Sequence, residues 1–317
     1  MNTTEPITTN TSEISPEANI NDLGISRVPD DQQNKSPSEL FYVWTAANIG
    51  ILGIVYGAIV VSFGLSFIQS ILAAALGIAS FSLVGITSIA GKKGRTTTLT
   101  LSRASFGKKG NIAPTAFSWM NLMGWEAVNI ITGTLTLSAL FVAIGFSESS
   151  ILTVISLAIF GGLTVLVSIL GQNVVVKLQE WITRTFGVMT LFVVGYLMLT
   201  ADWASIIALP QGDWLTGFLP AASIIASGTG ISWAIAGADY SRDQSQTSAG
   251  SSIFKAVVGG AALPLFLLIC AGILLTAQIP DLASHENPIA AIGKLLPTIE
   301  GIEASLSIEL KGESGDD

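Results

Sequence analysis

The sequence predicts an all-α integral membrane protein with about seven transmembrane helices. Three observations predict this class: half of the 317 residues are apolar, only 11% are charged, and the mean hydropathy is +0.64. A soluble domain usually carries about 25% charged residues. One cysteine (Cys270) excludes a disulfide scaffold, one histidine (His285) leaves little for a metal site or a Ser–His–Asp triad, and a net charge of −8 argues against nucleic-acid partners.

The chain is expected to divide into a tail, a core and a second tail. Residues 1–38 contain no apolar run and no basic leader region, so they are predicted to form a disordered tail. The transmembrane core is predicted over 39–278, followed by an external loop and acidic tail over 279–317. Seven apolar segments of about 20 residues match the thickness of a bilayer core. They are expected at 41–61, 68–90, 112–143, 151–170, 176–199, 218–238 and 257–277.

Two of these segments are predicted to be interrupted helices. The first reads WTAANIGILG over 44–53, and the sixth reads SGTGISWAIAGADY over 227–240. Glycines and small polar residues at membrane depth allow local unwinding, and a pair of such helices in two halves of a chain indicates a transporter site. The alternative is close helix packing, which is the commoner role of a single membrane glycine. Each segment also carries a tryptophan, Trp44 in the first and Trp233 in the sixth, which favours a transporter site over close helix packing.

The second segment is followed by a basic loop, which predicts the orientation. Six basic residues and no acid lie between the second and third segments, whereas the loops predicted on the other side carry only acids. Basic loops stay in the cytoplasm. The chain is therefore expected to be a multi-pass protein of the cytoplasmic membrane with its N-terminus inside.

The third segment supplies a candidate binding surface. Trp125 and Asn129 are four residues apart and share one helix face. An aromatic plane beside an amide suits a flat heteroaromatic ring, which stacks on the plane and hydrogen-bonds at its edge. Trp233 is a candidate for the second plane. The alternative for either tryptophan is packing or interfacial anchoring.

The remaining segments offer fewer signals. The fifth begins with Lys177, Glu180 and Arg184, whose spacing allows helix-spaced ion pairs at the surface, and Cys270 in the seventh suits a small packing residue. After 299 the acids are too frequent for another span.

At this point the residues resemble a family. The sequence ISWAIAGADYSR over 231–242 is similar to the sixth span of the purine–cytosine permeases, within the nucleobase–cation symporter-1 family. SRASFG over 102–107, and Gly124-Trp125 with Asn129, also resemble family motifs. The resemblance extends over about 38–297. It implies a LeuT-like five-plus-five inverted repeat, with a first repeat at about 41–199 and a partial second repeat at about 215–277.

The resemblance also implies roles for single residues. Trp125 would stack on one face of the substrate ring and Trp233 would close on the other. Asn129 would hydrogen-bond the ring edge, and the backbone around Ser232 and Gly230 would add polar contacts.

Other implied roles concern the coupling ion. The carbonyls of Ala46 and Ile49 align with Na⁺ ligands of a sodium-coupled relative. Glu126, next to Trp125, departs from the family pattern; it pairs with a substrate amine, carries a coupled proton, or bonds to a neighbouring helix.

The family has about twelve spans, and the eighth supplies the rest of the cation site. A truncated or frame-shifted gene product is therefore expected. The predicted function is a secondary active transporter for a nucleobase or related flat nitrogen heterocycle, such as cytosine, a purine or allantoin, coupled to Na⁺ or H⁺ and without a cofactor. The alternative is an inactive fragment of such a permease. A membrane-embedded enzyme is disfavoured, because Glu126 and Asp239 lie at opposite depths and supply no nucleophile–base pair.

Overall fold

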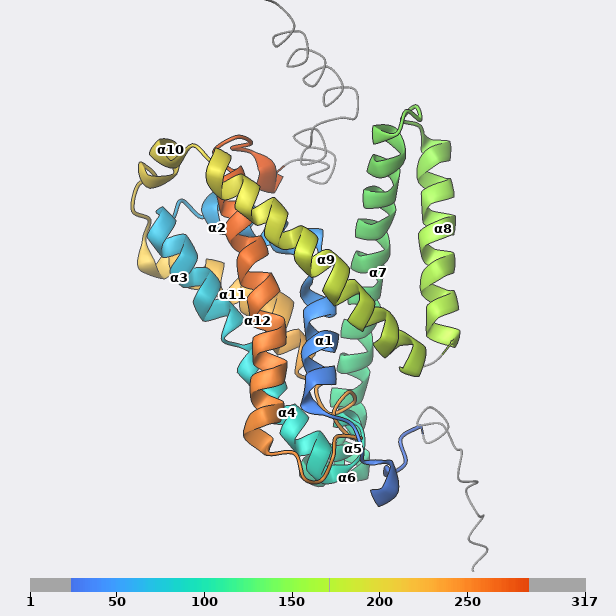
Figure 1. The fold of residues 1–317 in the computed structure, drawn as a ribbon. Coiled ribbons are helices and arrows are strands. Elements are labelled where there is room, and N and C mark those ends of the chain that lie inside the picture. The colour runs from blue at the N-terminus through green and yellow to red at the C-terminus, as the bar shows by residue number, and fades with distance from the viewer. Residues whose placement is uncertain (1–23, 171, 285–317) are drawn as a thin grey trace, which may run out of the picture.

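The computed structural model describes residues 24–170 and 172–284, and this part of the chain is built of helices joined by turns (Figure 1). Six of its helical segments are long and apolar enough to cross a membrane, and a bent pair of helices makes a seventh candidate. The predicted all-helical architecture of about seven spans is therefore present. Of the predicted tail at 279–317, residues 285–317 lie outside the described part, as does His285.

The first span is broken in two. Helix α1 (Pro37–Asn48) and helix α2 (Ile51–Ser62) pass the length and hydropathy test together but are bent by 61°. Pro37 begins α1 at a position where a missing N–H costs nothing. The predicted interruption of span one is confirmed.

The second span consists of α3 (Phe67–Ile78) and α4 (Phe81–Gly94), separated by a kink at Ala79–Ser80. A capping box of Ser66 and Gln69 begins α3. Arg95, at φ 60°, ends α4 in the left-handed conformation. Two short helices, α5 (Thr98–Leu101) and α6 (Arg103–Gly110), occupy the basic loop.

Three long helices follow. They are α7 (Ile112–Ala143), α8 (Ser150–Ile169) and α9 (Gln172–Thr200), and α7 has the bounds that hydropathy predicts. α7 and α8 pack along each other as a hairpin, while α9 runs diagonally across the bundle and packs on α1 (Figure 1).

The sixth span differs from its predicted bounds of 218–238. It follows α10 (Trp203–Ile207) and consists of a π-helical turn Trp214–Phe218, α11 (Leu219–Ala226) and a second π-helical turn Ser227–Ile231. It begins earlier because the carboxylate of Asp213 accepts the amides of Leu215 and Thr216, which caps the first turn. It ends earlier because the chain leaves the helix after Trp233 and runs in turns to Asp243.

The last helix, α12 (Gly250–Leu275), lies at the centre of the bundle and packs against α1, α2, α3, α4 and α9 (Figure 1). Its contact with α2 is very close: a Cβ on Gly57 would collide with the carbonyl oxygen of Ile269, and a Cβ on Gly272 with that of Ile54. Thr45 of α1 donates to the carbonyl of Gly260 at 3.0 Å. α12 therefore holds both halves of the broken first span.

Residues 24–36 are attached to the bundle by buried Val28 and Gln33 and by hydrogen bonds, which corrects the predicted disorder for this part of 1–38. Val28 is 1% exposed and its amide donates to the carbonyl of Arg95 at 2.8 Å. The amide nitrogen of the Gln33 side chain donates to the carbonyls of Lys92 and Arg242. Lys35 forms an isolated parallel bridge with Gln244. Polar residues of this segment are held by backbone partners, which a hydropathy profile does not reveal.

Candidate functional site

The first half of the candidate site is the break in span one. Ile49 and Gly50 are extended, with φ/ψ of −85°/99° and −171°/162°, so the helical hydrogen-bond ladder stops for two residues. Among the described residues, no hydrogen bond reaches the carbonyl oxygens of Ala46 and Ile49. Buried Asn48 donates to the carbonyl of Trp44 at 2.8 Å. Several carbonyls at the break, these two among them, are therefore left free, and such oxygens are ligands for a hard cation.

The second half is the segment where the sixth span stops being an α-helix. π-Helical turns are frequent at functional sites, and this one, Ser227–Ile231, contains two glycines. Gly230 is buried against Ser80 at the kink between α3 and α4, where a Cβ would not fit. The Ser232 hydroxyl donates to the carbonyl five residues earlier at 2.5 Å. From Ala234 to Asp243 the backbone forms turns rather than a helix.

The two broken spans touch each other at two places. The hydroxyl of Tyr56 on α2 donates to the carbonyl of Gly228 at 3.4 Å. The rings of Trp44 on α1 and Trp233 are 5.6 Å apart and nearly perpendicular, at 87°. Both interrupted segments therefore lie side by side, and Trp233 is half-buried between them.

The residues predicted on the third span lie on α7. Trp125 is half-buried, whereas Glu126 and Asn129 are exposed. The helix packs along α8, and a Cβ on Gly124 would meet open space. Within the described part of the chain, Trp125 has no aromatic partner, in contrast to Trp233. The structure brings Trp233 against Trp44 of α1, places Gly230 of the same segment against the kink between α3 and α4, and leaves the α7 residues on a separate helix.

An apolar groove of about 380 Å³ opens beside the break, between α1, α9 and α12. Ile49 and Thr45 line it from α1, and Pro264 lines it from α12. The hydroxyls of Thr45 and Thr183 already donate to backbone carbonyls. The groove is therefore mainly apolar, and Ile49 is the lining residue that also belongs to the break in span one.

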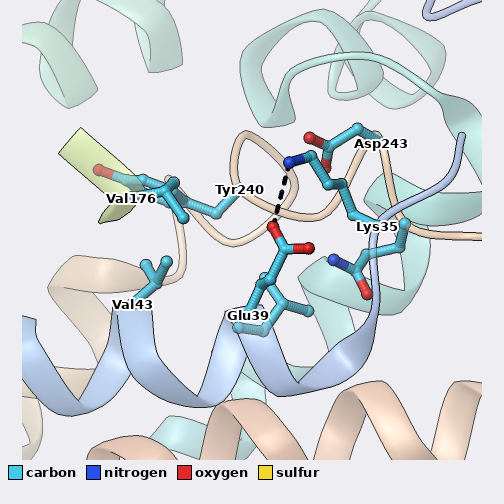
Figure 2. A pocket seen from close by; sticks show the side chains of 8 residues that line it. Lys35, Glu39, Val43, Val176, Tyr240 and Asp243 are labelled. Atoms are coloured by element: carbon cyan, nitrogen blue, oxygen red, sulfur yellow. Dashed lines mark ion pairs between the residues drawn. The ribbon is translucent and has the colours of Figure 1, made fainter. Parts of the chain in front are cut away.

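A much smaller cavity, of about 20 Å³, lies where the N-terminal segment meets the turn after span six (Figure 2). In it, Lys35 forms an ion pair with Glu39 at 3.3 Å, and buried Asp243 lies close by (Figure 2). Burial raises the pKa of Asp243 to about 6. Tyr240 also lines this cavity and packs against Trp44 at 5.8 Å, which connects it to the aromatic cluster.

Sequence reasoning missed part of this arrangement. It used Trp44 only as support for a site and predicted no contact for Tyr56 or Asn48. In the structure, all three residues lie where the two broken spans meet. The four-residue spacing of Trp44 and Asn48 was an available signal, because a side chain amide can reach the carbonyl one turn earlier.

The chain is similar in sequence to known permeases. A family profile described as permease for cytosine/purines, uracil, thiamine, allantoin matches residues 27–310. YxlA of Bacillus subtilis, named as a purine–cytosine permease, is 28% identical over 275 residues, which cover 83% of this chain and 56% of YxlA. The purine–cytosine permease FCY2 of Saccharomyces cerevisiae is 27% identical over 80% of this chain and 48% of its own length. The chain thus spans about half the length of these relatives.

A solved structure is similar in fold. Mhp1, a nucleobase-cation-symport-1 family transporter in a closed conformation with bromovinylhydantoin bound, superposes with a TM-score of 0.70 at 19% identity. The match covers 89% of this chain and 63% of Mhp1. It confirms the fold class predicted from the sequence.

Proposed function

The chain belongs to the family of permeases for cytosine/purines, uracil, thiamine and allantoin, and on that premise we propose that it binds a nucleobase-like heterocycle for secondary active transport. The relatives are named as permeases rather than as enzymes. Cytosine, a purine and allantoin are the substrates that we propose first. The observation that carries the proposal is the side-by-side contact of two interrupted spans at Trp44–Trp233 and Tyr56–Gly228.

The proposed substrate contacts combine stacking with backbone polar groups. Trp233 stacks on one face of the ring, and the unwound backbone near Ser232 and Gly230 bonds to its edge. Trp125 covers the opposite face and Asn129 contributes an amide, both from α7. Since α7 lies along α8, this part of the proposal requires α7 to approach the broken spans when the substrate binds.

The proposed coupling ion is Na⁺, with H⁺ as the alternative. Support for Na⁺ comes from the free carbonyls of Ala46 and Ile49. A proton would reside on Glu126. Measuring uptake against Na⁺ concentration and pH distinguishes Na⁺ coupling from H⁺ coupling. Uptake that does not depend on Na⁺ and that loses its pH dependence in Glu126→Gln supports the proton. An unchanged pH profile in Glu126→Gln discards it.

We also propose the cytoplasmic membrane as its location, with the N-terminus inside, because the basic loop of α5 and α6 lies at the same end of the bundle as the start of α1 (Figure 1). The alternative is that the chain is an inactive fragment of a permease. The basis for this alternative is that the matches cover about half of YxlA and FCY2.

The test is uptake and binding of radiolabelled cytosine, adenine, uracil, allantoin and thiamine in a host that lacks its own permeases. We expect saturable binding of at least one ring and its loss in Trp233→Ala. The matched control is Trp181→Ala, which changes an exposed tryptophan of α9. Absence of both uptake and binding for all five rings would leave the inactive fragment as the function.

A further inference from the structure

The contact between the broken spans is centred on one side chain, Trp44. It lies one turn before the break, on α1, and its side chain is among the largest fully buried ones, at 1% exposure. Its carbonyl is held by the Asn48 amide at 2.8 Å. The backbone that carries Trp44 is therefore fixed at the point where the helix ends.

Three aromatic rings surround the Trp44 indole, all edge to face. They are Phe81 at the start of α4 (6.1 Å, 71°), Trp233 (5.6 Å, 87°) and Tyr240 (5.8 Å, 73°). Trp233 precedes and Tyr240 follows the first residues after span six that are in turns, 234–239. Because edge-to-face geometry has a preferred orientation, the Trp44 ring restricts how the Trp233 ring can turn.

The Trp44 indole N–H has no hydrogen-bond partner among the described residues, although its nitrogen is buried. A buried donor without a partner is unfavourable, so hydrogen bonding does not hold this indole in place. Its packed faces do. A ring without the N–H should therefore serve in the same position.

We infer that Trp44 is a positioning residue for Trp233: it holds that ring in the orientation needed to stack on the substrate. The inference rests on the proposed function, because it assumes that Trp233 contacts a heterocycle. It differs from a plain core role in one respect. A core residue stabilises the bundle whatever Trp233 does, whereas a positioning residue affects binding only while Trp233 is present.

A double-mutant cycle on binding tests this difference. Dissociation constants are measured for detergent-solubilised full chain with the tightest-binding ring of the five-compound panel. Trp44→Met keeps an apolar side chain without a flat ring, and Trp233→Met removes the proposed stacking ring. We expect Trp44→Met alone to weaken binding about tenfold, the scale of a lost base–aromatic stack, and to weaken it less than about twofold when added to Trp233→Met.

Two further variants complete the design. Trp44→Phe should retain binding within about threefold of the wild type, since a ring remains to pack against Trp233. Tyr42→Leu is the control; this aromatic residue of α1 packs on Phe41 and Arg184, away from the cluster, and should leave binding unchanged.

The outcomes are separable. Independent, multiplying effects of the Trp44 and Trp233 substitutions would overturn the inference while leaving the proposed function intact, as would wild-type binding by Trp44→Met. Trp44→Leu replaces Trp44→Met if the latter does not fold; if neither folds but Trp44→Phe does, Trp44 is a core residue and the inference is wrong. If the wild type binds none of the five rings, the proposed function itself fails.

Discussion

Replacing Asp243 by asparagine should stabilise the protein above pH 6 and have little effect below pH 4. Asp243 is 6% exposed and lies at the end of the turn after span six. Its neighbour Lys35 forms an ion pair with Glu39 instead (Figure 2). The pKa of Asp243 is raised from 3.8 to about 6, mainly by burial; Glu39 also raises it, while a backbone hydrogen bond, Lys35 and Arg242 lower it.

The sign follows from the direction of this shift. A carboxyl group whose pKa is higher in the folded state binds its proton more tightly there, so protonation favours folding. That contribution is complete below pH 3.8 and is lost as the pH rises to about 6. A shift of roughly two pKa units corresponds to about 3 kcal/mol as an upper limit. Asparagine has nearly the same shape and carries no charge, so it should remove the loss.

The assay is thermal unfolding of the solubilised wild type and Asp243→Asn from pH 4 to pH 8. The difference between their melting temperatures should be near zero at pH 4, grow through pH 5 and 6, and stay constant above. Other titrating groups cancel in this difference. Asp31→Asn, at an exposed position of the same N-terminal segment, is the control and should show no trend. A pH-independent difference, or a less stable Asp243→Asn at pH 8, would refute the reasoning.

Two further predictions concern packing and capping. Gly57→Ala should lower the melting temperature, because the added Cβ collides with the Ile269 carbonyl. The control Gly259→Ala, in α12, meets open space and should not lower it in the same unfolding assay. Thr98→Val should destabilise the protein by about 1–3 kcal/mol, because the Asp239 carboxylate loses the hydroxyl donor at 2.7 Å; unaltered denaturant unfolding would show that water replaces it.

Local signals in the sequence account for the spans. The bounds of α7 agree with hydropathy because a continuous apolar stretch needs no partner to be recognised. The break at Ile49–Gly50 was predictable because Gly50 and its small polar neighbours weaken the helix. The interruption of span six within 227–240 was predictable on the same ground, but the residue at which its helix ends, Trp233, was not, because it depends on tertiary contacts such as that of Ser88 Oγ with the Gly237 carbonyl.

Long-range contacts account for what was missed at the site. The docking of residues 24–36 depends on single hydrogen bonds to partners far along the chain, for example from Gln33 to the Arg242 carbonyl, 209 residues away. Such single hydrogen bonds produce no repeating pattern in the sequence from which they could be predicted. The role of Trp44 was hidden for the same reason: a tryptophan in a span can face lipid or the core, and only its neighbours decide. Substrate roles for Trp125, Asn129 and Glu126 stay predictions.

The central place of α12 has a consequence for biosynthesis. The bond from Thr45 to the Gly260 carbonyl joins residues 215 apart in the chain. At a synthesis rate of about 5–20 residues per second, the first span waits roughly 10–40 s for this partner. During that interval the glycine-bearing surface of α2 faces lipid or the translocation machinery. A substitution there would act first on membrane insertion, and reduced yield would precede any change in the finished protein.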